Sequence, residues 1–293
     1  MRVLILGGTG MLGHKLWQVL RDGHEVHVAA RQGWSTWDRL GLYQADRFHT
    51  GLEAGIPDTL LHIMGSVRPE VVVNCVGIVK QVPTAVDPIA SLTGNALFPH
   101  RVARACWAAG TRMVQISTDC VFSGNKGGYT EADTPDPDDL YGRSKLLGEV
   151  SGPGCLTVRT SMIGRELTRQ SGLLEWFLSN RNGKVRGYTN AIFSGFTTRA
   201  LGEVLARIIE EQPDLTGLYH VAGEPISKYA LLRKIAAAFA LRTEIEPYAE
   251  FRCDRSLDGT RFRLATGWRP PSWDEMIEGL TSDPTPYDQW RST

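Results

Sequence analysis

The chain has 293 residues, of which 42% are hydrophobic, and its 32 lysines and arginines balance its 32 aspartates and glutamates. A chain of this length and composition can bury the core of one large α/β domain, or of a nucleotide-binding domain with a smaller companion. The balanced charge gives no indication of a nucleic-acid partner or of an anionic membrane.

The cysteines and the N-terminal segment indicate a cytoplasmic protein. The five cysteines are scattered and form no CxxC pair, a pattern typical of reduced thiols and not of a disulfide framework or a zinc site. The sequence runs from Met1 directly into a strand-like segment, with no basic start and no cleavable apolar stretch. No apolar run approaches the roughly 20 residues that cross a bilayer. We therefore expect no membrane partner and no metal.

The first half of the chain alternates strand-like and helix-like segments, which is typical of a parallel sheet covered by helices. Several strand-like runs are wholly apolar, as expected of strands buried on both faces. No firm element is predicted from 32 to 65. The predicted strands are 3–6, 25–30, 71–76 and 113–117, and the predicted helices are 11–21 and 91–109.

The second half begins with a loop, because residues 124–139 are rich in Gly, Pro and Asp. Beyond this loop the alternation of helices and strands resumes, and the sequence therefore predicts an α/β fold. The predicted helices are 141–150, 199–212, 228–239 and 273–280, and the predicted strands are 156–160 and 218–221.

A glycine turn follows the first strand, because residues 4–13 read LILGGTGMLG. A turn without Cβ atoms lets backbone N–H groups approach a pyrophosphate, and the N-terminus of the following helix adds a favourable dipole. A tight turn that binds nothing is the alternative. The strand before the turn and the helix after it favour a dinucleotide site.

The end of the second strand favours NADP over NAD. An Asp or Glu about 20 residues beyond the turn would bind the ribose 2′-hydroxyl of NAD. The chain instead reads AARQ at 29–32, with no carboxylate, and Arg31 can pair with a 2′-phosphate. The alternative is that Arg31 stacks near the adenine and tolerates both cofactors, so NAD stays open.

The sequence YGRSK places Tyr141 and Lys145 four residues apart, on one face of a predicted helix. A phenol with a pKa of about 10 exchanges protons poorly at neutral pH until a nearby cation stabilises the phenolate, and Lys145 is in position to do this. The pair alone is commonplace. Thr118, however, lies at the end of the preceding strand, where ligands meet the carboxyl edge of parallel sheets. The three residues together predict a catalytic site in which a hydroxyl holds a carbonyl beside the tyrosine.

With these motifs the chain resembles the extended short-chain dehydrogenase/reductase family, and within it the dTDP-4-dehydrorhamnose reductase branch. The likeness extends over most of the chain and is weakest from 32 to 65. It is carried by GGTGMLG at 7–13, NCVG at 74–77, STDCVFSG at 117–124, YGRSK at 141–145, VRTSMIG at 158–164, SGFTTRALGEVL at 194–205, YHVAGEPISKYALL at 219–232 and RFRLATGWRPPSWDEMI at 261–277.

The resemblance implies a Rossmann-like, doubly wound parallel sheet with a small C-terminal α/β substrate domain. The NAD(P)-binding domain would comprise residues 1–160 and about 190–222. The substrate domain would comprise about 161–189 and 223–293. The resemblance also implies a homodimer.

By motif position, the resemblance assigns catalytic roles to Thr118, Tyr141 and Lys145. The implied cofactor contacts are Gly7, Gly10, Met11, Leu12, Gly13, Arg31, Cys75, Val76, Gly77, Thr160 and Ser161, together with Tyr141 and Lys145. The implied substrate contacts are Lys80, Val121, Phe122, Phe193, Arg255 and Arg261.

One departure from the family pattern argues against dehydration of the sugar. Relatives that dehydrate a nucleotide sugar carry an acidic residue directly after STD, where this chain has Cys120. A thiol with a pKa of about 8.5 is a poor substitute for that carboxyl group. The resemblance then implies NADPH-dependent reduction of the keto group of a nucleoside-diphosphate 4-keto-6-deoxy sugar. An NAD(P)-dependent epimerase and a non-catalytic, NADP-binding regulatory subunit are the alternatives.

Overall fold

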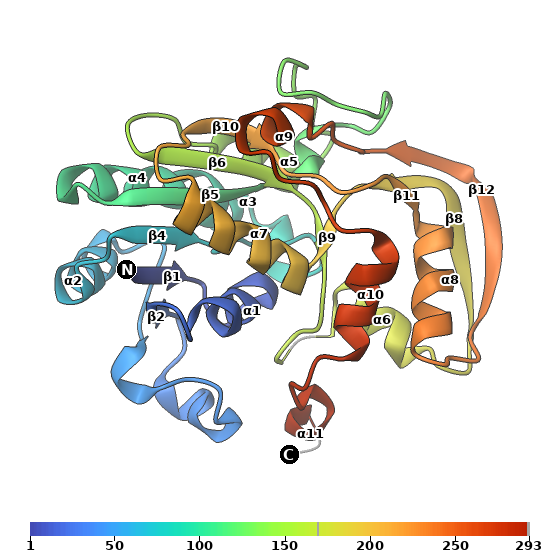
Figure 1. Ribbon diagram of the computed structural model, residues 1–293, viewed down its shortest axis with the longest axis horizontal. Coiled ribbons are helices and arrows are strands. Elements are labelled where there is room, and N and C mark those ends of the chain that lie inside the picture. The colour runs from blue at the N-terminus through green and yellow to red at the C-terminus, as the bar shows by residue number, and fades with distance from the viewer. Residues whose placement is uncertain (169, 292–293) are drawn as a thin grey trace.

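A seven-stranded parallel sheet forms the centre of the computed structural model, which describes residues 1–168 and 170–291 (Figure 1). Its strand order is β10-β6-β5-β4-β1-β2-β3, and every neighbouring pair is parallel. The doubly wound α/β fold is thereby confirmed. The strands are β1 (Arg2–Leu6), β2 (Glu25–Ala29), β3 (Phe48–His49), β4 (Val71–Asn74), β5 (Arg112–Thr118), β6 (Cys155–Thr160) and β10 (Gly217–His220).

Strand β1 shows why helices cover both faces of this sheet. Successive side chains of a strand point to opposite faces, and all four apolar residues from Val3 to Leu6 are fully buried. Val3 and Ile5 pack in one core cluster with residues of α1 (Met11–Leu20) and α7 (Thr198–Glu211). Leu4 and Leu6 pack in another cluster with α2 (Pro57–Val67) and α4 (Phe98–Ala109). The uninterrupted apolar run therefore reflects two separate cores.

The helix predicted from 91 to 109 is divided. The structure has α3 (Pro88–Ser91), a π-helical turn at Leu92–Leu97, and then α4. Pro99 near the start of α4 has no N–H to donate, so a regular α-helical ladder cannot pass through it. The π-helical turn carries Asn95, which contacts the loop after β4 and the helix α5 (Leu140–Leu147).

A second, three-stranded sheet stands beside the large one, in the order β11-β8-β12. Helix α8 packs on it, and Figure 1 shows this unit at the right of the molecule. Its strands are β8 (Lys184–Phe193), β11 (Ile226–Ser227) and β12 (Glu244–Asp254). The remaining elements are β7 (Met162–Ile163), β9 (Phe196–Thr197), α6 (Leu173–Ser179), α8 (Lys228–Ala238), α9 (Thr260–Thr266), α10 (Trp273–Thr281) and α11 (Tyr287–Arg291). The division of the chain into two domains stays a prediction, and β8 crosses its predicted boundary near residue 190.

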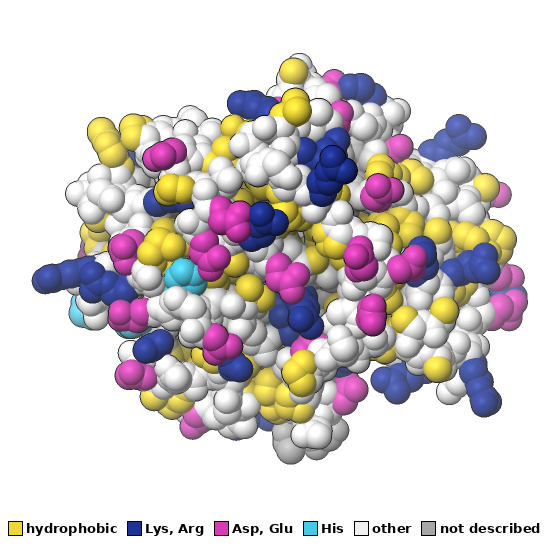
Figure 2. Space-filling model, in the orientation of Figure 1, with side chains coloured by type: hydrophobic (Ala, Val, Ile, Leu, Met, Phe, Trp, Pro, Cys, Tyr) yellow, Lys and Arg dark blue, Asp and Glu magenta, His cyan; other side chains and the backbone are white. Residues whose placement is uncertain are grey.

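The segment from 32 to 65, for which no element was predicted, contains more regular structure than its pattern indicates. Three short 3₁₀ turns, the two-residue strand β3 and the helix α2 occupy it. Within the described parts of the chain, no helix is both long and apolar enough to cross a membrane. Figure 2 shows positive and negative side chains interspersed on one face, in keeping with the balanced charge.

Replacing Gly13 with Ala should destabilise the fold. A Cβ at this position would lie 2.3 Å from the Gly7 carbonyl oxygen and 2.7 Å from the Gly8 Cα, and backbone atoms cannot rotate away. We expect a loss of about 1–3 kcal/mol in the free energy of unfolding, measured by denaturant titration. Gly65→Ala is the matched control, because nothing lies within 4 Å of a Cβ there and the site is in α2. That variant should gain about 0.5–1 kcal/mol. Equal effects at the two glycines would contradict the prediction.

Candidate active site

The glycine turn after β1 leads into α1 with no side chain capping the start of that helix. Gly7 adopts φ +75°, and the N–H groups of Gly7 and Gly8 both donate to the Ala29 carbonyl at the end of β2. Gly10 is the N-cap of α1 and offers no side-chain acceptor to the first N–H groups of the helix. These N–H groups have no partner within the helix. The turn therefore fits a pyrophosphate, which would accept hydrogen bonds from them.

The turn is held from behind by a residue that the sequence pattern did not indicate. The hydroxyl of Tyr43, a residue that is 8% exposed, donates to the Gly8 carbonyl at 2.9 Å. Tyr43 lies in the unpatterned segment, and no motif links it to the turn. Arg31, the candidate for a 2′-phosphate, is exposed two residues beyond β2.

The loop after β4 lies against the same turn. A Cβ on Gly7 would come within 3.0 Å of the Val76 nitrogen, so Gly7 and the predicted cofactor loop Cys75–Gly77 are neighbours. The Asn95 side chain accepts from the Ile78 N–H at 2.7 Å and donates to Ser144 Oγ at 3.1 Å. Asn95 therefore joins this loop to α5, the helix that carries Tyr141 and Lys145.

Helix α5 places the predicted catalytic residues beside the end of β5. Asp139 caps the helix by accepting from the Gly142 N–H at 2.8 Å. The ammonium of Lys145 donates to the Ile116 carbonyl of β5 at 2.6 Å. Thr118 ends the same strand, and its hydroxyl donates to Asp119 and accepts from the Cys120 N–H, both at 3.1 Å.

Burial controls the protonation of Tyr141 and Lys145. Burial raises the pKa of Tyr141 well above its ordinary value, Cys120 and Asp119 act in the same direction, and a hydrogen bond with Thr118 opposes them. Burial lowers the pKa of Lys145 to about 8, and the charge of Glu149 opposes that fall. The prediction that Lys145 stabilises the Tyr141 phenolate stays a prediction, because Lys145 is here bonded to Ile116.

A buried ion pair supports the lysine. Arg159 of β6 binds both carboxylate oxygens of Glu149 at 2.7 Å, and Ser117 donates to the same carboxylate at 2.7 Å. Glu149 follows Lys145 by four residues. No sequence motif links Arg159 to Glu149, although an arginine inside an otherwise uncharged buried strand indicates that it needs a partner.

Two predicted substrate contacts lie near the ends of β5 and α5, where the catalytic candidates are. The Lys80 ammonium lies 2.5 Å from Asp139 and 5.7 Å from the centre of the Tyr141 ring. Arg255 donates to the Phe122 carbonyl at 2.8 Å and lies 3.7 Å from the Cys120 sulfur. A basic group from the loop after β4 thus lies at the Tyr141 ring, and another, directly after β12, lies at the residues that follow Thr118.

The other predicted substrate contacts lie elsewhere or are covered. Val121 and Phe122 are fully buried, so only their backbone could meet a ligand. Phe193 is 7% exposed and packs against Trp273 in the core. Arg261 lies on α9, with its guanidinium 4.8 Å from the centre of the Tyr219 ring.

The cofactor candidates of β6 lie at its carboxyl end. Thr160, which ends the strand, is 1% exposed, and Ser161 follows it. Thr160 pairs in register with Thr118 of the neighbouring strand β5. Both residues therefore lie at the same edge of the sheet as the catalytic candidates.

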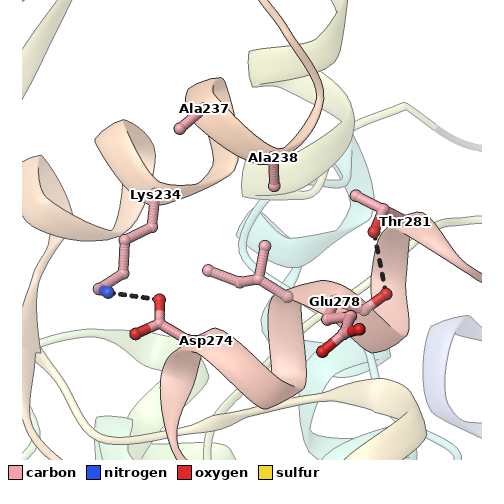
Figure 3. Close-up of a pocket in the computed structure, with 7 residues that line it drawn as sticks. Lys234, Ala237, Ala238, Asp274, Glu278 and Thr281 are labelled. Carbon is pink, nitrogen blue, oxygen red and sulfur yellow. Dashed lines mark hydrogen bonds and ion pairs between the residues drawn. The ribbon is translucent and has the colours of Figure 1, made fainter.

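A hollow of about 550 Å³ opens between α8 and α10, and it is not part of this site (Figure 3). Lys234 pairs with Asp274 at 2.5 Å across it. None of the predicted site residues lines it; the lining residues are Lys234, Ala237, Ala238, Asp274, Ile277, Glu278 and Thr281. Over residues 1–168 and 170–291, no three His, Cys, Asp or Glu side chains are grouped as metal ligands.

Comparison with known proteins gives one family and relatives with two kinds of name. The profile of the RmlD substrate binding domain family matches residues 1–283. The chain is 26% identical over 258 residues to Methionine adenosyltransferase 2 subunit beta of Rattus norvegicus, covering 82% of this chain and 72% of the relative. It is 24% identical over 304 residues to the dTDP-4-dehydrorhamnose reductase of Aggregatibacter actinomycetemcomitans, covering 95% and 98%.

A solved structure shares the fold. The dTDP-4-dehydrorhamnose reductase of Bacillus anthracis, in complex with NADP, matches with a TM-score of 0.79, covering 95% of this chain and 98% of the other. The identity is 22%. A likeness at that identity bears on the fold alone.

Replacing Lys145 with Met should stabilise the protein at neutral pH. The pKa of Lys145 falls from 10.5 to about 8 on folding, so the unfolded chain binds more protons between these values, and stability of the natural protein rises with pH across that window. Below about pH 8 the folded state bears the full cost, roughly 3 kcal/mol. The free energy of unfolding is measured for both proteins at pH 7 and at pH 10.5. The Met variant should have the larger value at pH 7, and the two values should be similar at pH 10.5. Lys126→Met, at an exposed lysine, serves as the control. A gap that is the same at both pH values would sink the prediction.

Proposed function

The chain belongs to the RmlD substrate binding domain family, and we propose that it reduces the keto group of a nucleoside-diphosphate 4-keto-6-deoxy sugar with NADPH. The observation that carries the proposal is the meeting of Thr118, Tyr141 and Lys145 at the sheet edge that also holds the glycine turn. The relative named dTDP-4-dehydrorhamnose reductase, which covers nearly the whole chain, supports it.

The residues at the sheet edge fit a dinucleotide. The glycine turn and the N-terminus of α1 would hold the pyrophosphate, Arg31 the 2′-phosphate, and the loop Cys75–Gly77 the adenosine side. The lack of space for a Cβ at Gly13 supports this fit indirectly, because it lets α1 pack closely against the glycine turn, as in dinucleotide-binding turns. When bound, NADPH supplies a hydride for the carbonyl carbon.

The proton comes from the chain itself. Tyr141 keeps its proton at neutral pH, because burial raises the pKa of its phenol, and it is the general acid for the carbonyl oxygen. Thr118 orients that oxygen with its hydroxyl. The C=O bond gains a hydride at carbon and a proton at oxygen, and the phenolate left on Tyr141 takes up a proton from water. The Lys145 ammonium, which is charged below about pH 8, stabilises that phenolate.

Lys80 and Arg255 are the residues proposed to hold the substrate. The Lys80 ammonium lies 5.7 Å from the centre of the Tyr141 ring and the Arg255 guanidinium lies 3.7 Å from the Cys120 sulfur. Both cations match the oxygens of a sugar or a diphosphate. Asp139 now pairs with Lys80, and it also caps α5. A substrate that engages Lys80 would therefore compete with Asp139, the residue that caps the helix of the general acid.

A second candidate function is that of a cofactor-binding subunit of another enzyme. The relative named Methionine adenosyltransferase 2 subunit beta supports it. One feature of the site also favours it: the Lys145 ammonium is bonded to the Ile116 carbonyl. A phenol that has a raised pKa and no ammonium bound to it is a weak acid. It would therefore protonate a carbonyl oxygen poorly, as expected of a subunit that does not catalyse a reaction.

The first test is NADPH consumption, and separately NADH consumption, across a panel of nucleotide-linked 4-keto-6-deoxy sugars. We expect one sugar to drive oxidation, with NADPH preferred. Tyr141→Phe should lose this turnover by a factor of about 10²–10⁴, because it removes the general acid, and should still bind NADPH. Turnover without net NADPH consumption would indicate an epimerase. NADPH binding with no reaction across the panel would favour the subunit function.

Arg31→Ala tests the choice of cofactor. Losing a charge-assisted contact to the 2′-phosphate should raise the dissociation constant of NADPH by roughly 10- to 100-fold. The dissociation constant of NADH should hardly change, because NADH has no phosphate at that position. Fluorescence titration with each cofactor measures both. An equal loss for the two cofactors would assign Arg31 to the adenine and not to the phosphate.

A further inference from the structure

The chain ends in a segment that lies directly behind the glycine turn. After α10 ends at Thr281, residues 283–290, here called the C-terminal strap, run against the helix α1. The family profile ends at residue 283, so all but the first residue of the strap lie beyond it. Most of the strap therefore lies outside the part of the chain that the family profile matches.

A relay of two hydrogen bonds connects the strap to the turn. The His14 Nδ1 atom lies 2.7 Å from the Gly10 carbonyl oxygen, and its Nε2 atom lies 2.8 Å from the Tyr287 hydroxyl. A carbonyl can only accept, so Nδ1 donates, and Nε2 must accept from Tyr287. His14 is fully buried, and burial lowers its pKa to about 4. The ring is therefore neutral and in a single tautomer near neutral pH.

The relay acts on the Gly10–Met11 peptide unit at the start of α1. The Gly10 carbonyl accepts twice from His14, from its backbone N–H at 3.1 Å and from its ring at 2.7 Å. The Gly10 carbonyl and the Met11 N–H belong to one planar peptide unit. Fixing the carbonyl therefore fixes the direction of the first N–H of α1, one of the donors available to a pyrophosphate.

Further bonds fix the strap along α1. Lys15 pairs with Asp283 at 2.6 Å, with both side chains less than one-tenth exposed. Asp283 also accepts from the Thr285 hydroxyl at 2.7 Å, and Gln18 donates to that hydroxyl at 3.0 Å. The Arg165 guanidinium lies 4.9 Å from the centre of the Tyr287 ring. These bonds hold the strap against α1, and Tyr287 presents its hydroxyl to His14.

We infer that the C-terminal strap, through Tyr287 and His14, sets the glycine turn in the orientation that binds NADPH. Tyr287 and His14 are positioning residues, because neither touches the reacting atoms. The inference rests on the cofactor part of the proposed function and not on the identity of the sugar.

The test is Tyr287→Phe in the full-length protein, with NADPH as the probe. The substitution keeps the ring over Arg165 and removes only the hydroxyl, so His14 Nε2 loses its donor inside the protein. We expect NADPH to bind roughly 5- to 30-fold more weakly by fluorescence titration. The increase in Tm that saturating NADPH produces should shrink accordingly. If a sugar that the protein reduces is known, the substitution should raise the KM for NADPH and leave kcat unchanged.

Tyr248→Phe is the matched control, because its hydroxyl bonds to Glu250 in β12, on the sheet that α8 covers. It should bind NADPH as the natural protein does.

A chain ending at Thr285 removes Tyr287 together with α11 and should bind still more weakly. If that chain does not fold, Tyr287→Phe alone decides. An NADPH dissociation constant that stays the same while the Tm of the free protein falls would overturn the inference, since the strap would then be purely structural. Weaker NADPH binding with no sugar reduced would leave the inference standing and reject the reductase.

Discussion

The parallel course of all seven strands is the constraint on which the site depends. Because no strand of the large sheet reverses, the carboxyl ends of β1, β4, β5 and β6 meet at one edge. The turn at Gly7 then touches Val76, and Thr118 and Thr160 come into register. Each of these contacts follows from the strand order, and none from nearness in sequence. The two faces of the sheet must both be covered for this arrangement to persist, and the continuous apolar runs provide for that.

Charged side chains are buried near the same edge of the sheet. Lys145 is 6% exposed, and burial lowers its pKa, which is a cost to the folded state. The ion pair of Arg159, which is buried, with Glu149, which is partly buried, is weak evidence for stability in itself. Its location gives it another role, because the Glu149 carboxylate favours the charged form of Lys145. The fold therefore accepts a loss of stability in holding an ammonium group at this buried edge of the sheet.

The parts of the fold and site that could be predicted are those whose cause is local. A few consecutive residues are enough to identify the glycine turn, the pair of Tyr141 and Lys145, and the apolar strands of the large sheet. Strand β12 was missed because it is largely exposed, so its sequence carries neither an apolar run nor a clear alternation. Helix α2 was missed because it lies in a segment with no recognisable motif around it.

The long-range supports of the site could not be read from the sequence. Tyr43 reaches the glycine turn from the unpatterned segment, and Tyr287 reaches it from the end of the chain. Each supplies one hydrogen bond, and a single hydroxyl-bearing residue produces no repeating pattern in the sequence that could reveal its role. His14 is an informative case, since a histidine in the apolar face of a helix requires a donor and an acceptor that only the tertiary structure reveals.

The two candidate functions differ at the Lys145 ammonium and agree at the glycine turn. A reductase needs that ammonium to act on the Tyr141 phenol, whereas a cofactor-binding subunit can leave it on the Ile116 carbonyl. Both need the dinucleotide bound, and both therefore need the Gly10 peptide held in one orientation. The strap thus serves a step that precedes the chemistry. Its effect belongs to cofactor binding under either function, which is why NADPH affinity, and not turnover, is the property that isolates it.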